Sequence, residues 1–504
     1  MYPTFDKIRE MAAGDYKRVP ICKELYADSY TPVEMMRILQ KASHHCYLLE
    51  SASQSEAWGR YSFLGYDPSM EITCTDGILR IRKTSKTETF GRSGNAAESS
   101  TEEVRQVAHP GDAIREIISQ YKSPVMDDMP TFTGGLVGYF SYDYIKYSEP
   151  KLELKDKEQQ DFRDLDLMLF NDVIAFDHYR QKVLLITGVM TEDLEKSYKQ
   201  ACEKLEEMTA LIKKGEKKIF PPIRLKSEIQ PQFPKEKYCQ MVETAKHYIH
   251  EGDIFQVVLS NPMRAKAEGS LFDTYRVLRA TNPSPYMFYF SSDDIEIAGA
   301  SPETLVKLDH GKLSTFPLAG TRPRGKTKQE DRELEEGLLK DEKELAEHNM
   351  LVDLGRNDIG KISAFGTVEV EKYMSIEHFS QVMHIGSTVA GELREDKDAI
   401  DAVDAILPAG TLSGAPKFRA CQIIEELEQS KRGIYGGAIG YLDFAGNLDS
   451  CIAIRLVYKK KGEICIRSGA GIVADSVPEK EFEECCNKAR AVVLAIQKAQ
   501  EGLE

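Results

Sequence analysis

Short apolar runs recur along the chain in the pattern of β-strands. They are rich in Val, Ile, Leu, Phe and Tyr and are bounded by polar residues or glycine, which is typical of strands. The runs are YLLESA (47–52), LMLFNDVIAFDH (167–178), KVLLITGV (182–189), DIFQVVLS (253–260), YMFYF (286–290), SCIAIRLVYK (450–459) and EICIRSGAGIV (463–473). The segment 192–214 instead has helical periodicity. Because strand-like runs follow one another in pairs as often as they alternate with helices, we predict an α+β fold with mostly antiparallel sheets.

Two polar stretches interrupt this pattern. Residues 83–103 are short of apolar side chains and predict a long surface loop, for which we have no functional interpretation. Residues 213–237 are rich in lysine and proline and predict a linker. This linker would divide the chain into an N-terminal region, 1–212, and a C-terminal domain, 238–500.

One predicted helix, 341–358 (DEKELAEHNMLVDLGRND), carries acids on its apolar side. At the angular step of an α-helix, Glu344, Glu347 and His348 fall within the arc that also holds Leu351. Charge runs on helices are usually solvated, but a buried unpaired charge costs several kcal/mol. We therefore expect a cation beside this pair of glutamates.

A second pair of glutamates lies near the C-terminus, in SVPEKEFEE (476–484). Ser476 and Glu479 fit a capping box, and Pro478 suits a first helical turn. Glu481 and Glu484 are again three residues apart on the predicted apolar side. Either pair alone is common by chance. Together they suggest four carboxylates around one hard divalent cation, Mg²⁺ or Ca²⁺, and an incomplete protein shell favours Mg²⁺.

Glycine and arginine residues near the second pair predict an anion site. Gly469 and Gly471 end a strand-like run, where they form either a backbone anion site or an ordinary tight turn. Tyr435 and Arg455 are predicted on neighbouring strands, and Arg455 suits a bidentate contact with a carboxylate. Together these residues describe a site for a small carboxylate-bearing substrate bridged through Mg²⁺.

Composition narrows the classes of partner. The net charge of −15 argues against nucleic acid or an anionic membrane as a partner. The first residues carry acids and lack an apolar core segment, and no apolar run is long enough to span a bilayer, so we expect a cytoplasmic protein. The ten cysteines contain no CxxC pair, which argues against zinc or a disulfide framework.

Several motifs in order resemble the chorismate-utilising enzymes. The motifs are FPLAGTRPRG (316–325), DEKELAEHNMLVDLGRND (341–358), LPAGTLSGAPK (407–417), YGGAIGY (435–441) and SGAGIVADSVPEKEFEE (468–484). The resemblance covers nearly the whole C-terminal part. It implies a β-sandwich-like core with surrounding helices. It also implies that Mg²⁺, bound to both glutamate pairs, holds the ring carboxylate of chorismate, with Glu347 and Glu484 as direct ligands.

The resemblance also implies roles for further residues. Chorismate contacts would come from Gly320, Thr321, Tyr435, Arg455, Gly469, Ala470 and Gly471. Glu303 matches the acid that protonates the departing ring hydroxyl, and His384 and Thr411 match active-site positions. His384 either orients or polarises the leaving group or is a satisfied structural histidine.

Three features separate the members of the family. Ala319 stands where aminodeoxychorismate synthases typically have a nucleophilic lysine. Gln256 stands where the water-adding isochorismate and salicylate synthases have a lysine base, which ammonia does not need. LLES (48–51) and NPSPYM (282–287) resemble a regulatory tryptophan site, with Ser51, Pro285, Tyr286 and Met287 as effector contacts.

The resemblance therefore implies conversion of chorismate and ammonia to anthranilate and pyruvate, the first step of tryptophan biosynthesis, under inhibition by L-tryptophan. The sequence has no nucleophile motif of a glutaminase, so a partner glutamine amidotransferase subunit should supply the ammonia in a hetero-oligomer. The alternatives are an aminodeoxychorismate synthase, an isochorismate or salicylate synthase, a non-catalytic tryptophan-binding regulator, and a divalent-ion-binding module without chemistry.

Overall fold

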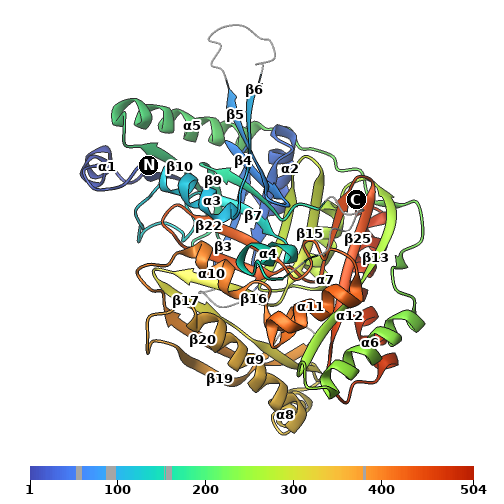
Figure 1. Ribbon diagram of the computed structural model, residues 1–504. Helices are drawn as coiled ribbons and strands as arrows, with labels where there is room; N and C mark the ends of the chain where they lie inside the picture. Colours follow the sequence, from blue (N-terminus) through green and yellow to red (C-terminus); the bar gives the residue numbers. More distant parts are fainter. Residues whose placement is uncertain (53–58, 87–97, 153, 155–161, 379–381, 504) are drawn as a thin grey trace.

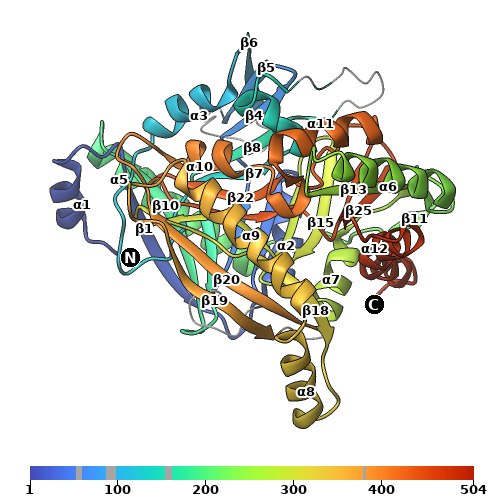
Figure 2. The same cartoon turned by 60° about the horizontal axis from the view of Figure 1, so that its bottom comes forward.

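Two large antiparallel sheets, covered by helices on their outer faces, form the computed structural model (Figures 1 and 2). The structure describes residues 1–503 except 53–58, 87–97, 153, 155–161 and 379–381. Every pairing between named strands in these residues is antiparallel.

The first sheet runs in the order β1 (Arg18–Tyr26), β10 (Lys182–Met190), β9 (Val173–Asp177), β3 (Tyr61–Tyr66), β2 (Cys46–Glu50), β14 (Tyr286–Ser291), β15 (Ile295–Ser301), β24 (Leu456–Lys460), β25 (Glu463–Ile472), β13 (Gln256–Glu268) and β11 (Arg224–Leu225). The short strands β12 (Gln230–Pro231) and β21 (Gly414–Ala415) also pair with β13.

The second sheet runs in the order β18 (Leu318–Pro323), β20 (Val382–Glu392), β17 (Lys312–Thr315), β16 (Thr304–Asp309), β23 (Leu448–Ile452), β22 (Ala438–Asp443), β7 (Gly135–Phe140), β8 (Leu165–Phe170), β4 (Met70–Thr75), β5 (Ile78–Lys86) and β6 (Glu98–Gln106), with β19 (Glu369–His378) on β20.

The α-helices are α1 (Phe5–Ala12), α2 (Pro32–Ala42), α3 (Pro110–Ser119), α4 (Ile145–Ser148), α5 (Leu194–Lys214), α6 (Lys235–His250), α7 (Phe272–Thr281), α8 (Lys328–Leu338), α9 (Glu342–Gly360), α10 (Ala399–Ile406), α11 (Lys417–Glu428) and α12 (Pro478–Gln500). Two 3₁₀ turns are η1 (Tyr142–Tyr144) and η2 (Gly410–Leu412).

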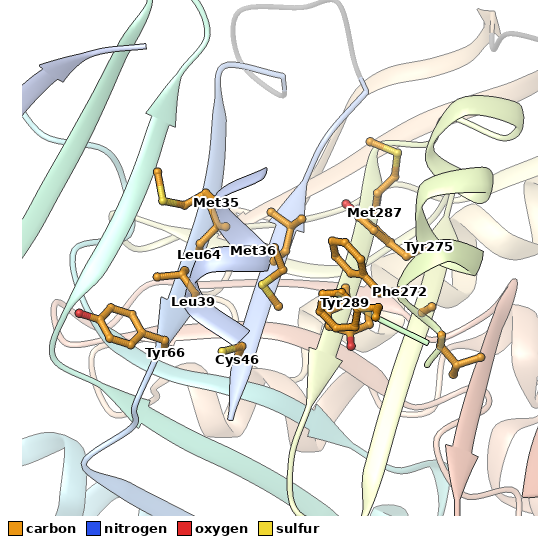
Figure 3. Packing of buried hydrophobic residues seen from close by; sticks show 14 of the residues in the cluster. Met35, Met36, Leu39, Cys46, Leu64, Tyr66, Phe272, Tyr275, Met287 and Tyr289 are labelled. Atoms are coloured by element: carbon orange, nitrogen blue, oxygen red, sulfur yellow. The ribbon is translucent and has the colours of Figure 1, made fainter. Parts of the chain in front are cut away.

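The core has three layers of apolar contact. Between the sheets, aromatic side chains such as Tyr47, Phe288 and Tyr441 pack together. On the outer face of the first sheet lie α2, α5, α7 and α12, and Figure 3 shows side chains from α2 and α7 against β2, β3 and β14. On the outer face of the second sheet lie α3, α10 and the end of α9. The predicted α+β sandwich with surrounding helices is therefore confirmed.

Both sheets combine strands from the two sides of segment 213–237. In the first sheet β2 pairs with β14, and in the second β7 pairs with β22. Within the segment itself, β11 and β12 add to the edge of β13 before α6 begins. The division at this segment is therefore a division of the sequence and not of the sheets.

The predicted loop at 83–103 is partly wrong. Residues 83–86 and 98–103 belong to the β5–β6 hairpin, and residues 87–97 lie outside the described part of the chain. Lys83 pairs with Thr101, and both are exposed. Backbone pairing does not require apolar side chains, so a polar hairpin leaves no hydrophobic periodicity to detect.

The two glutamate-bearing helices begin differently. The Asp341 carboxylate caps α9 by accepting hydrogen bonds from the N–H groups of Lys343 and Glu344. Pro478 occupies the first turn of α12 as predicted. The predicted capping box does not form, because Val477 takes the N-cap position and the Ser476 hydroxyl accepts from the N–H of Val473 instead.

Candidate active site

A cavity of about 910 Å³ opens where β13, β18, β20 and β25 meet α9, α12 and η2, and we call it the carboxylate cavity. Most of the predicted site residues line it, namely Gln256, Glu303, Gly320, Thr321, Glu344, Glu347, His384, Thr411, Tyr435, Arg455, Gly469, Gly471, Glu481 and Glu484. Ala470 does not. Side chains alternate along β25, so Ala470 packs in an apolar cluster with Tyr238 and Cys485 on the other face.

Glu303 follows β15 and is almost fully buried at the cavity wall. Its Oε1 accepts a hydrogen bond from the Thr411 hydroxyl at 3.0 Å. Burial raises the pKa of Glu303 to about 7, although the Thr411 hydrogen bond and the nearby Arg455 act in the opposite direction. A carboxyl group that keeps its proton near neutral pH is suited to general acid catalysis.

His384 on β20 reaches the same cavity. Its Nδ1 lies 2.8 Å from the carbonyl oxygen of Gly320 and 3.2 Å from the Thr321 hydroxyl. Burial lowers the pKa of His384 to about 4, so the ring is neutral at pH 7. Because a carbonyl can only accept, Nδ1 carries the proton and Nε2 is the basic nitrogen.

Tyr435 and Arg455 lie beside strands rather than in them, so their predicted placement on neighbouring strands is wrong. Tyr435 precedes β22, and Arg455 lies in the link between β23 and β24 with a left-handed φ of 52°. Both residues line the carboxylate cavity. Burial lowers the pKa of Arg455, which indicates a guanidinium poorly compensated by charge and suited to an anionic ligand.

Gly469 and Gly471 lie inside β25, so the tight-turn alternative is wrong. A Cβ at Gly469 would lie 2.9 Å from the Tyr435 hydroxyl, and one at Gly471 would lie 2.5 Å from Gln256 Nε2. The glycines therefore make room for these two side chains. Gln256 is buried, and within the described structure its Oε1 accepts no hydrogen bond.

The four glutamates reach the cavity from two helices, α9 and α12. Glu344 lies 3.3 Å from Arg322, and Glu484 lies 2.7 Å from Lys488. Glu347 has no ion pair among the described residues. Burial and then the neighbouring Glu344 raise the pKa of Glu347, and burial raises that of Glu481. Acids that raise one another's pKa fit a site for a divalent cation.

The glutamates do not form a closed ligand set. In the described residues, one group of three ligand side chains has atoms within 4.8 Å of one another, and it is His45, Glu71 and Asp293, where Arg82 bridges both acids. The predicted placement of Glu484 on the apolar side of α12 is also wrong. Its side chain is 48% exposed, because it borders the open cavity, whereas Cys485 and Ala495 on that side of α12 pack in the core.

A smaller cavity of about 260 Å³, which we call the Tyr286 cavity, brings together Ser51, Pro285, Tyr286 and Met287. The pairing of β2 with β14 places Glu50 opposite Met287, so the two predicted motifs meet. The Tyr286 hydroxyl donates to Asp449 Oδ1 at 2.8 Å and lies 3.0 Å from the Thr304 hydroxyl.

Sequence reasoning missed part of both cavities. Arg60, Lys307, Tyr441 and Asp449 line the Tyr286 cavity, and Lys343, Arg467, Lys480 and Lys488 line the carboxylate cavity. Lys488 had a detectable signal, because it follows Glu484 by four residues on one helix. Lys343 and Lys480 are the sequence neighbours of Glu344 and Glu481 on the same two helices. Arg467 and the four residues of the Tyr286 cavity depend on packing between distant segments.

The chain is similar to known chorismate binding enzymes along nearly its whole length. The family model of chorismate binding enzymes matches residues 44–494. The chain is 44% identical to anthranilate synthase component 1 of Acetivibrio thermocellus over 99% of both chains, and 42% identical to that of Aquifex aeolicus over 99% of both. The crystal structure of anthranilate synthase component I from Streptococcus pneumoniae superposes with a TM-score of 0.73 at 37% identity, covering 86% of this chain and 92% of that one.

A menaquinone-specific isochorismate synthase from Escherichia coli, at 17% identity and a TM-score of 0.69 over 98% of this chain and 99% of that one, shares the fold. Among the described residues, no helix is long and apolar enough to cross a membrane. By the family match over most of its length, the chain belongs to the chorismate binding enzymes.

Proposed function

We propose that this chain is the chorismate-converting component of an anthranilate synthase, which forms anthranilate and pyruvate from chorismate and ammonia in tryptophan biosynthesis. The names of relatives at 40–44% identity over nearly their full length support this activity. The observation that carries the choice of nucleophile is the buried Gln256 amide in the carboxylate cavity. Gln256 Oε1 can accept a hydrogen bond from ammonia but cannot deprotonate water.

The first step adds ammonia at C2 of the ring while the C4 hydroxyl leaves as water. Glu303, protonated because its buried carboxyl has a pKa of about 7, supplies the proton to the departing oxygen. The Thr411 hydroxyl holds Glu303 Oε1 and so orients the acid. Arg455, Tyr435 and the backbone at Gly320, Thr321, Gly469, Ala470 and Gly471 would hold the substrate.

The second step removes the C2 proton and the enolpyruvyl group, which leaves as pyruvate and makes the ring aromatic. His384 Nε2, the ring nitrogen left without a proton when Nδ1 donates to Gly320, is the proposed group for this proton transfer. A Mg²⁺ ion held by Glu344, Glu347, Glu481 and Glu484 would bind and polarise the ring carboxylate.

The proposal includes a second component. We propose a glutamine amidotransferase subunit that releases ammonia from glutamine and a hetero-oligomer that delivers it. The N-terminal region, 1–212, is proposed to regulate the catalytic domain, 238–500, through L-tryptophan bound in the Tyr286 cavity. A cytoplasmic location fits the ten cysteines, all of which are unpaired.

Anthranilate fluorescence from the purified chain tests the proposal. The chain is mixed with chorismate, Mg²⁺ and ammonium, and then with glutamine in place of ammonium. We expect product with ammonium, none with glutamine, and loss of activity with EDTA. Consumption of chorismate without anthranilate or pyruvate would contradict the proposal and favour an amino- or hydroxy-adding member of the family, such as an aminodeoxychorismate or isochorismate synthase.

A further inference from the structure

A buried ion pair joins the last residues of two motifs, and neither of these two residues has a role in the steps above. Asp358 ends the LGRND segment on α9, and Lys417 ends the GAPK segment at the start of α11. Lys417 Nζ lies 2.8 Å from Asp358 Oδ2, and the two side chains are 15% and 6% exposed. Lys361 lies 3.2 Å from the other Asp358 oxygen, but its side chain is 44% exposed.

Lys417 also fixes the segment that carries Thr411. Its Nζ donates to the carbonyl oxygen of Ile406 at 2.9 Å, so one ammonium group ties together α9, the end of α10 and the start of α11. Ile406 and Lys417 bracket the turn η2 on both sides. Thr411 in this turn donates its hydroxyl to Glu303.

The turn packs closely on α9 at Gly410 and Leu354, but this packing is incomplete. A cavity of about 40 Å³, which we call the rear cavity, lies between them and is lined by Glu303, Thr411, Gly410, Leu354 and Asp358 among others. The lining atoms of a void lack contact partners on one side. The Asp358–Lys417 pair therefore adds a constraint between the turn and α9 to this partial packing.

We propose that Asp358 and Lys417 are positioning residues that hold the Thr411 hydroxyl on the Glu303 carboxyl. They touch no substrate and act through the turn. Losing Lys417 leaves Asp358 with only the half-exposed Lys361, and losing Asp358 leaves the buried Lys417 without an acid, so the turn and α9 would move apart or admit water. This inference rests on the proposed role of Glu303 as general acid.

A second buried lysine–aspartate ion pair, whose lysine also pairs with Asp76, serves as a control. Lys146 Nζ lies 2.8 Å from Asp164 Oδ2, with side chains 18% and 1% exposed, and neither residue lines the carboxylate cavity or the rear cavity. Lys146→Met should lower the melting temperature about as much as Lys417→Met. A purely structural role for Lys417 predicts that the two variants also behave alike in catalysis.

The test is a double-mutant cycle of Lys417→Met and Thr411→Val, with ammonium as the nitrogen source. We expect Lys417→Met to lower kcat about tenfold in the wild-type background and less than about twofold in Thr411→Val. Lys146→Met should leave kcat unchanged, and Lys417→Arg should restore most of it. If Lys417→Met lowers kcat by the same factor in Thr411→Val as in wild type, the two residues act independently and the proposal is overturned.

Two further measurements test the proposal if Lys417→Met does not fold or if the wild-type chain forms no anthranilate. If Lys417→Met does not fold, Asp358→Asn, which keeps the side-chain shape, replaces it in the cycle. If the wild-type chain forms no anthranilate, the proposed function fails. The Thr411–Glu303 distance in a crystal structure of the Lys417 or Asp358 variant then decides the positioning claim. An unchanged distance of about 3.0 Å would overturn it.

Discussion

The carboxylate cavity and the Tyr286 cavity differ in how their charges are compensated. In the Tyr286 cavity, Asp449 accepts from Tyr286, and Glu50 is paired with Arg279. In the carboxylate cavity, Glu347 has no ion pair among the described residues, and Glu303 is buried with a raised pKa. The larger cavity therefore holds a glutamate without an ion pair, whose charge a cation would compensate. In the smaller cavity burial also raises the pKa of Asp449, but both acids have a partner in the described structure, which suits a ligand that only binds.

The cavities also differ in origin. The described residues that line the carboxylate cavity all come from position 256 onward. The Tyr286 cavity takes Ser51 and Thr131 from the first part of the chain and Met287 and Cys451 from the second. A ligand in the smaller cavity thus contacts both parts, and Tyr286 links it to Thr304, the neighbour of Glu303. This arrangement suits regulation of the larger site.

The largest expected effect comes from removing one proposed metal ligand from each of the two helices. Glu347→Gln combined with Glu484→Gln should lower kcat/KM about a thousandfold, equivalent to about 4 kcal/mol, because half of the proposed metal ligands are lost. The same variant should melt at a higher temperature than wild type in EDTA, because like charges no longer repel. Glu342→Gln on the exposed face of α9 is the control, and retained activity in the double variant would contradict the metal site.

Glu303→Gln tests the buried acid. General acid catalysis contributes about 100-fold or more, so kcat should fall by about that factor. At a fixed concentration of free ammonia, wild-type kcat/KM should decline as the pH rises through about 7, where Glu303 loses its proton, and the variant should lack this limb. If kcat/KM of Glu303→Gln still declines above about pH 7, the decline comes from another titrating group.

The pH dependence of the free energy of unfolding tests the raised pKa of Glu303 independently of catalysis. The folded-state pKa of Glu303 lies above the unfolded value, so its favourable contribution is complete at low pH and is lost as the pH rises through about 7. Denaturant unfolding of Glu303→Gln should therefore show a smaller loss of stability between pH 5 and 8 than wild type.

Ser51→Phe probes the smaller cavity. A phenyl ring in a space of about 260 Å³ should exclude an indole ligand, so the tryptophan concentration for half inhibition should rise at least about tenfold. The kcat with chorismate and ammonium should stay unchanged, because Ser51 does not line the carboxylate cavity. Ser119→Phe, at an exposed residue that lines neither cavity, controls for added surface area. Unaltered inhibition would place tryptophan elsewhere.

Ala470→Ser should have the smallest effect on catalysis. The Ala470 side chain packs in the core, so only its backbone can reach a ligand, and the chorismate KM should change less than about twofold. A hydroxyl in this apolar cluster should instead lower the melting temperature, at a cost of about 1–3 kcal/mol. A large KM change without loss of stability would mean that the side chain faces the substrate.

Some features followed from local sequence alone. The spacing of three residues placed Glu344 with Glu347, and Glu481 with Glu484, on one face of each helix, because the α-helical repeat is constant. The apolar runs predicted the strands, and their pairing in succession predicted antiparallel sheets. The outer part of the β5–β6 hairpin, 83–86 and 98–103, was missed, because it lacks the apolar alternation that Leu79 and Ile81 provide at the start of β5.

Other features were decided only by the tertiary structure. Which way each helix faces, whether toward the core or an open cavity, made Glu484 exposed and Glu347 half-buried. The register of β25 against β13 turned Ala470 into the core and Gly471 toward Gln256. Residue types and spacings within one element thus come from the sequence, because local backbone geometry is fixed. The distances between elements, and with them the pKa of Glu303, depend on packing among segments far apart in the chain.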